Sequence, residues 1–353
     1  MTLLALGSNG SGQLGVGHNE DLCTPGKCQL VQHITFSGIK QVVAGGNHTL
    51  VLLHSGQVEV FGSNEHHECA AYQTGDSSVT SEPPFNSTRD DLGPRTIAQV
   101  AANWTASTYL DHAGAIATCG EGLSGELGQG RDVSTSATPG FIKGFAPGHE
   151  RVVQIASSMA HTVAVLGNGE IWGWGKGRKG QLGAPAQDAW TPRKIEVGFP
   201  VVKAVCGKDF TFVAGDAIEG RVALIGADGR DRFKLKSSVP DNLPGWKEIA
   251  ASWGSVFILF DDGRLVGYGR DDHGQLPPFG LPPVAQVAAG SEHCIALTRD
   301  GRVLAWGWGE HGNCGERTDD NRDVKGKWNK IEVAGRPIDV FAGCATSFIV
   351  TAT

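Results

Sequence analysis

The chain has 353 residues, of which 51 are glycine, and this glycine share is about twice the usual one of roughly 7%. Its 30 basic and 37 acidic residues give a net charge of −7, which argues against a nucleic-acid backbone as the main partner, because phosphate binding needs clustered Lys and Arg. The eight cysteines form no Cys-x-x-Cys pair, the first residues lack the basic segment of a signal peptide, and no apolar stretch could span a bilayer. We therefore expect a cytoplasmic protein with reduced thiols, with the nucleus as a second candidate compartment.

A unit of three short strands is visible from the first residues onward. Residues 3–6 are an apolar strand that ends at Gly7, and the phrase Gly-Ser-Gly-Gln-Leu-Gly follows at 10–15. Further on, residues 42–44 and 50–53 are apolar runs separated by two glycines, and residues 58–61 alternate apolar and polar side chains after a Ser-Gly turn. Glycine supplies the positive φ that such hairpin turns need. This pattern predicts three antiparallel strands in each unit.

The unit recurs along the whole chain. The glycine that ends each third strand is found at Gly7, Gly62, Gly120, Gly175, Gly226, Gly269 and Gly307. The intervals of about 38 to 58 residues fall among the periods of propeller repeats. One unit cannot bury its own faces, so the units are expected to pack radially and hide their edges. The sequence predicts an all-β, seven-bladed β-propeller that forms a single domain over residues 1–353.

The two ends of the chain indicate how the ring closes. The chain begins inside a third strand, at residues 3–6, and ends after a second strand, at residues 347–351. Together the ends complete one blade, so we expect the N- and C-terminal strands to pair. Residues 70–94 are rich in Ser, Thr, Pro and Asp, which predicts a surface insertion.

Candidate binding residues come from departures from the repeat. In a propeller, the loops after the first and third strands emerge on one face and the Asp-Gly hairpins on the other. Several first loops end in a histidine, which we interpret as structural and hydrogen-bonded within its blade. Trp104 and Trp253 are interpreted as replacements of this histidine, which either fill its space or contact a partner. The predicted partner-binding set is Trp104, Lys208, Asp209, Trp253, Glu292, His293, Trp308, Glu310 and His311.

Chemical motifs are weak by comparison. The run His66-His67-Glu68-Cys69 has metal-ligand residue types, but adjacent residues rarely hold one ion without distant partners. The phrase Gly173-Trp174-Gly175-Lys176-Gly177 imitates a dinucleotide fingerprint, yet it opens no predicted helix. A nucleophile elbow, a phosphate loop and a carboxylate pair are all missing from the sequence. We expect no catalytic residue, cofactor or metal, and hence a binding scaffold rather than an enzyme.

The histidine loop, the Trp-Gly strand ends and the Gly-Gln-Leu-Gly phrases resemble the regulator-of-chromosome-condensation repeat family over the whole chain. That resemblance implies a seven-bladed propeller.

A narrower resemblance, to the fungal alpha-tubulin suppressor or killer-toxin-insensitivity proteins, rests on residues 6–21, 207–210, 290–293, 306–315 and 343–346. It implies a heterodimer with a small zinc-binding protein that serves diphthamide synthesis on elongation factor 2 and Elongator-dependent modification of wobble uridines in transfer RNA. No direct contact with nucleic acid or membrane is expected. The alternative is guanine-nucleotide exchange on a small Ran-like GTPase, the activity of the family's founding member.

Overall fold

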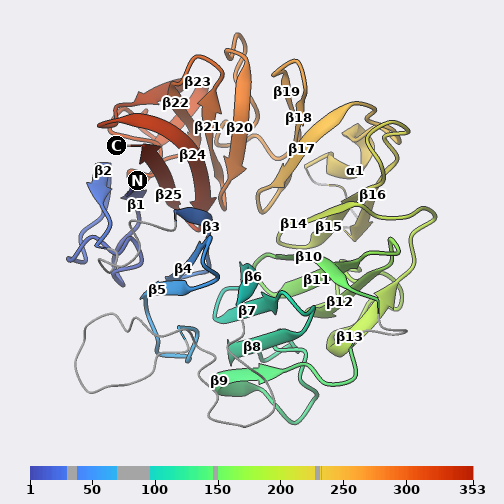
Figure 1. Cartoon of the computed structure of the whole chain (residues 1–353). Helices are drawn as coiled ribbons and strands as arrows, with labels where there is room; N and C mark the ends of the chain where they lie inside the picture. The colour runs from blue at the N-terminus through green and yellow to red at the C-terminus, as the bar shows by residue number, and fades with distance from the viewer. Residues whose placement is uncertain (30–37, 70–95, 146–149, 227–230, 232, 353) are drawn as a thin grey trace.

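The computed structural model describes residues 1–29, 38–69, 96–145, 150–226, 231 and 233–352. Their strands form seven antiparallel sheets, and Figure 1 shows these sheets arranged as blades around a central axis. The chain is therefore a seven-bladed β-propeller, as the repeat predicted. The insertion expected at 70–94 lies outside the described residues. In the described part of the chain, no helix is long and apolar enough to cross a membrane.

The blades are numbered here in chain order, starting from the blade that both ends share. Blade I contains β24 (Arg336–Gly343), β25 (Thr346–Ala352), β1 (Thr2–Gly7) and β2 (Leu22–Lys27). Blade II contains β3 (Ile39–Ala44), β4 (His48–Leu53) and β5 (Val58–Gly62), and blade III contains β6 (Ile97–Ala102), β7 (Ala106–Asp111), β8 (Ile116–Glu121) and β9 (Thr135–Phe141). Blade IV contains β10 (Val152–Ser157), β11 (His161–Leu166), β12 (Ile171–Gly175) and β13 (Ala189–Ile195).

The remaining blades complete the ring. Blade V contains β14 (Lys203–Cys206), β15 (Phe210–Ala214) and β16 (Val222–Gly226), which the short helix α1 (Leu235–Ser238) follows. Blade VI contains β17 (Trp246–Ala251), β18 (Ser255–Phe260) and β19 (Leu265–Gly269). Blade VII contains β20 (Val284–Ala289), β21 (His293–Thr298), β22 (Val303–Trp308) and β23 (Asp323–Ile331).

The ring closes through blade I. Strand β1 pairs with β25 in antiparallel register from Thr2–Thr351 to Gly7–Thr346. In Figure 1 the two chain ends lie next to each other in this blade. The expected pairing of N- and C-terminal strands is confirmed.

Burial differs sharply between neighbouring strands of a blade. All six residues of the second strands β4 and β21 are buried, whereas the first strands β3 and β20, which line the channel, are only partly buried. A second strand is covered by neighbouring blades on both faces, so it needs apolar side chains on both. This explains the continuous apolar runs of the sequence.

Neighbouring blades are joined by pairs of hydrogen bonds from glutamine side chains that follow a repeated β-bulge. The pairing register of the first strand shifts immediately before Gln41, Gln99, Gln154 and Gln286. A bulge re-aims the side chain beside it, and each glutamine amide reaches the first strand of the next blade. Gln41, for example, donates to the carbonyl of Val100 at 3.0 Å and accepts the Val100 N–H at 3.1 Å. Gln154 and Gln286 bond in the same way to both backbone groups of Ala204 and Val340. Gln99 instead donates to the Val153 carbonyl and accepts the Ile155 N–H.

Candidate functional site

The histidine position of the repeat is fixed by the strand register. His48, His161 and His293 lie opposite the glycine that ends the third strand of their blades. In blades III and VI the residues at this position are Ala106 and Ser255. Trp104 and Trp253 lie two residues earlier, in the middle of the loop. The interpretation that these tryptophans replace the histidine is therefore wrong.

The three histidines join blades to each other. Each is 0% exposed, and each Nε2 lies within hydrogen-bonding distance of a hydroxyl on the next blade: Ser107 at 3.0 Å for His48, Thr211 at 3.0 Å for His161 and Ser347 at 2.9 Å for His293. Burial lowers the pKa of each imidazole to about 4. The structural role was predicted, but the bond runs between blades and not within one. The expectation that His293 contacts a partner is wrong, because this side chain has no exposed surface.

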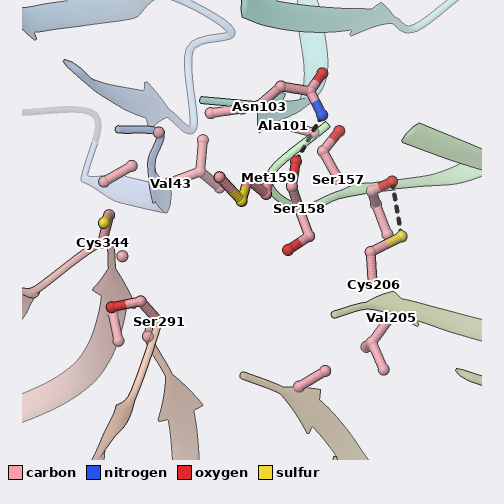
Figure 2. Close-up of a pocket in the computed structure, with 18 of the residues that line it drawn as sticks. Val43, Ala101, Asn103, Ser157, Ser158, Met159, Val205, Cys206, Ser291 and Cys344 are labelled. Atoms are coloured by element: carbon pink, nitrogen blue, oxygen red, sulfur yellow. Dashed lines mark hydrogen bonds between the residues drawn. The ribbon is translucent and has the colours of Figure 1, made fainter. Parts of the chain in front are cut away.

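The middle positions of the first loops surround one mouth of the central channel. They are occupied by Gly46, Trp104, Met159, Lys208, Trp253, Ser291 and Cys344, all of which line the channel cavity of about 260 Å³ except Lys208. Figure 2 shows Met159, Ser291 and Cys344 around this opening. Backbone bonds link the loops along the rim, as from Trp104 N–H to the Met159 carbonyl at 2.9 Å and from Trp253 N–H to the Ser291 carbonyl at 3.0 Å. These bonds brace the rim on both sides of the two tryptophan loops.

Two tryptophans from opposite sides of the ring meet at this mouth. Trp104 comes from blade III and Trp253 from blade VI, and their ring centroids are 6.0 Å apart with a tilt of 45°. The Trp104 indole lies over Gly46, where an added Cβ would be only 2.8 Å from it. Trp104 is nevertheless 38% exposed, and Trp253 is half-buried. The pair presents aromatic surface to solvent across the channel.

A pocket of about 360 Å³ opens beside Trp253, between blades V and VI. Its lining residues are Lys208, Asp209, Phe210, Asp231, Phe233, Leu235, Trp253, Gly254, Arg270 and Glu292. Four of them belong to the predicted partner-binding set. The Lys208 ammonium lies 5.3 Å from the centre of the Trp253 ring, and the Arg270 guanidinium 5.1 Å from that of Phe233. These are cation–π distances.

Arg270 forms ion pairs with two carboxylates at this pocket. It forms ion pairs with Glu292 and, at 2.6 Å, with Asp272. Burial would raise the pKa of Asp272, but hydrogen bonds from Arg270 and Gln275 outweigh it and hold the value at about 2. Sequence reasoning missed Arg270. It follows Gly269 at the position where Ser8 and Ser63 follow their glycines, so an alignment of the repeats could have identified it.

The other predicted residues form a separate group over blade VII. Trp308 ends β22 and is half-buried, with the ring of His311 at 5.4 Å and that of His273 at 6.4 Å. The His311 Nδ1 pairs with Asp21 of blade I at 2.7 Å, and Glu310 is exposed. The structure therefore divides the predicted set between the channel mouth and this outer patch on the same face.

In the run from His66 to Cys69, the Glu68 and Cys69 side chains bond to backbone groups, whereas the His66 ring lies 3.5 Å from the Glu121 carboxylate. The Glu68 carboxylate accepts the His66 N–H at 2.8 Å, and the Cys69 thiol donates to the Ser63 carbonyl at 2.9 Å. Among the residues that the structure describes, no three His, Cys, Asp or Glu side chains are grouped so that they could hold a metal ion.

Several known proteins are similar to this chain in sequence. The RCC1 repeat-containing protein C10F6.04 of Schizosaccharomyces pombe is 31% identical over 298 residues, which cover 77% of this chain and 78% of that protein. The human E3 ubiquitin-protein ligase HERC2 is 30% identical over 78% of this chain but only 6% of its own length. The bovine secretion-regulating guanine nucleotide exchange factor is 28% identical over 78% of this chain and 61% of its own.

Solved structures share the fold at lower identity. Prp20p from Saccharomyces cerevisiae has a TM-score of 0.83 and 21% identity, covering 100% of this chain and 92% of its own. Human WBSCR16 has a TM-score of 0.81 and 18% identity, with 100% of both chains covered. The model of the RCC1-like domain matches residues 2–350. The chain thus belongs to the RCC1-like domain family.

Proposed function

We propose that this RCC1-like propeller is a non-enzymatic scaffold whose channel mouth binds a small zinc-binding partner protein. The observation that carries the proposal is the Trp104–Trp253 pair, which is partly exposed at the middle of one face and centred 6.0 Å apart. Tryptophan is enriched among residues that dominate binding energy, and such residues cluster near the centre of an interface. The braced rim keeps the pair in place, which lowers the entropy lost on binding.

The residues around the pair suit a protein partner. The neighbouring pocket combines two aromatic walls with fixed ionic groups, a mixture that is typical of hot-spot pockets with a polar rim. The three histidines at the repeat position, His48, His161 and His293, and six cysteines are buried. These features support binding rather than catalysis.

The cellular role proposed is support of diphthamide synthesis on elongation factor 2 and of Elongator-dependent wobble-uridine modification. It rests on the resemblance of residues 207–210, 290–293 and 306–315 to the fungal alpha-tubulin suppressor proteins. We place this heterodimer in the cytoplasm and in the nucleus.

Purification of the tagged chain from its own cells tests this function. We expect a stoichiometric small partner that contains zinc, and joint loss of both modifications when the gene is deleted. The alternative is nucleotide exchange on a small GTPase, because one relative carries the name of an exchange factor. Faster release of labelled GDP from a Ran-like GTPase, with no zinc protein bound, would favour the alternative.

A further inference from the structure

The contact between blades VI and VII closely repeats the contact between blades II and III. The first strands of blades III and VII both contain Ala-Gln-Val, at 98–100 and 285–287. The strands that face them contain Lys-Gln at 40–41 in blade II and Lys-Glu at 247–248 in blade VI. The two contacts thus differ at the glutamine that joins neighbouring blades, because blade VI has a carboxyl group in its place.

The lysines show that the two contacts have the same geometry. The Lys40 ammonium donates to the Ala98 carbonyl at 2.8 Å, and the Lys247 ammonium donates to the Ala285 carbonyl at 2.9 Å. The pairing register with the second strand also shifts at the lysine in both blades. The residue that follows each lysine is therefore presented to the next blade in the same way.

The side chains at this next position differ in one hydrogen-bond donor. Gln41 donates to the Val100 carbonyl at 3.0 Å and accepts the Val100 N–H at 3.1 Å. In blade VI the Val287 N–H is a hydrogen-bond donor to the Glu248 carboxylate. An ionised carboxyl group can only accept hydrogen bonds, whereas a protonated one also has an O–H donor. Only the protonated form of Glu248 can make both of the bonds that Gln41 makes.

The surroundings of Glu248 favour this protonated form. Burial raises the pKa of Glu248 above its usual value of 4.5, and the charge of Asp339 in blade I raises it further. Lys203 of blade V, Lys247 and the Val287 N–H lower this pKa but do not cancel the effect of burial. Strands β18 and β20, which pack against β17, carry no charged residue. Glu248 therefore takes up its proton at a higher pH than an exposed glutamate does.

We propose that Glu248 is a proton-dependent switch in the contact between blades VI and VII. In the protonated state its O–H donates to the Val287 carbonyl, and two bonds join the blades as in blades II and III. When the proton leaves to solvent, this second bond is lost and the carbonyl faces a negative charge. The folded protein binds the proton more tightly than the unfolded chain, so this contribution to stability is complete below pH 4.5 and is lost as the pH rises through the folded pKa.

The switch lies in the wall below the channel mouth. Strands β17 and β20 lead into the loops of Trp253 and Ser291, which are joined by the bond from the Trp253 N–H to the Ser291 carbonyl at 3.0 Å. Protonation of Glu248 therefore strengthens the contact between the two strands that support this part of the rim. The switch depends on contacts within the chain and is independent of the partner proposed above.

Urea denaturation of the full chain from about pH 5 to about pH 8 tests the switch. Glu248→Gln supplies the missing donor at every pH, so at pH 8 we expect an unfolding equilibrium constant at least about fivefold lower than that of the wild type. This difference should shrink as the pH falls. Glu316→Gln is the matched control, because Glu316 is exposed, and it should change nothing at any pH. A Glu248→Gln variant without added stability at pH 8, or with the same gain at every pH, overturns the proposal.

The reverse exchange and a direct observation of the proton complete the test. Gln41→Glu creates the Lys-Glu pair of blade VI in blade II, so it should destabilise the fold more at pH 8 than at pH 5. In carbon-13 spectra of glutamate-labelled protein, the carboxyl resonance that is missing in Glu248→Gln should titrate above pH 4.5. A resonance that titrates at or below this value, or a loss in Gln41→Glu that is the same at both pH values, contradicts the proposal.

Discussion

The first loops of the blades are of two kinds, which differ in the residue at the histidine position of the repeat. In blades II, IV and VII the loop ends in a buried histidine that bonds to a hydroxyl of the next blade. In blades III and VI that position holds Ala106 or Ser255, and a tryptophan stands two residues earlier at the channel mouth. The histidine loops hold the ring together, and the tryptophan loops project side chains into solvent.

Blade III shows how the structural task is met without a histidine. Asn103 donates to the carbonyls of Ser158 and His161 at 2.6 and 3.0 Å, and Thr162 donates to its side-chain oxygen at 3.1 Å. The asparagine thus makes the bond between blades from the first position of the loop. The next residue, Trp104, is at the middle position of the loop, where the histidine blades carry Gly46, Met159 and Ser291.

Both kinds of loop depend on a closed ring, and deleting residues 347–353 tests whether the ring closes through blade I. The deletion removes most of β25, which lies between β1 and β24 in blade I. Both neighbours would then have unpaired edges, so we expect no cooperative melting transition in circular dichroism. A truncated chain that melts at the wild-type temperature contradicts closure through blade I.

Acidification should weaken the histidine loops. Folding lowers the pKa of three histidines from 6.5 to about 4, so their contribution to stability is complete above pH 6.5 and is lost as the pH falls toward 4. Burial raises the pKa of Glu59 to about 7, and this group has the opposite effect. Burial also raises the pKa of Glu126, Glu248 and Glu292, so these carboxyls act in the same direction as Glu59. At no more than about 1.4 kcal/mol per pH unit for each group, the three histidines lose at most about 6 kcal/mol between pH 6.5 and 5, and the carboxyls offset part of this loss.

Urea denaturation at the two pH values measures this loss. His161→Gln should reduce the pH dependence by the share of one histidine. If the dependence is the same in this variant, His161 does not titrate as its burial requires.

Truncation of one histidine separates stability from binding. His161→Ala leaves a cavity and removes the bond to Thr211, so we expect a loss of about 3 kcal/mol in the free energy of unfolding. Partner affinity of the folded protein should not change, because the side chain has no exposed surface. Thr211→Val, which removes the same bond from the other side, should cost about 1 kcal/mol. Weaker binding in both variants at a temperature where they are folded would show that the two kinds of loop are coupled.

Two hairpin glycines probe the face away from the tryptophans. Gly56 and Gly301 have φ values of +86° and +83°, and an added Cβ would meet Thr96 at 2.8 Å in the first case and nothing within 4 Å in the second. A left-handed conformation costs an L-residue about 1–2 kcal/mol. Gly301→Ala should therefore lose about 1 kcal/mol of stability and Gly56→Ala more, with binding intact in both. Chemical denaturation measures both losses. If the two variants lose the same free energy of unfolding, the structure around Thr96 accommodates the added Cβ without cost.

The fold was predictable because its signals are local. Glycines such as Gly7 and Gly307, with φ of +117° and +101°, end each third strand, and the split of one blade between the two ends of the chain is visible in the sequence. The site was only partly predictable. Trp104 and Trp253 were identified, but their place in the loop was misassigned, since Ala106 and Ser255 do not mark the histidine position. Their contact joins residues far apart in sequence, and no local pattern indicates it.

The central claim is that the tryptophan pair is a binding surface and not a structural element. Isothermal titration of the proposed zinc-binding partner into Trp104→Ala/Trp253→Ala tests it most directly, with melting curves for all variants. Ile218→Ala is the control, because Ile218 is an exposed apolar residue in another loop. Loss of a buried aromatic anchor costs about 2 kcal/mol or more, so we predict affinity at least about thirtyfold weaker in the double variant, near-wild-type melting and normal binding by the control. A double variant that binds as tightly as the wild type, or one that binds weakly only because it has unfolded, contradicts the claim.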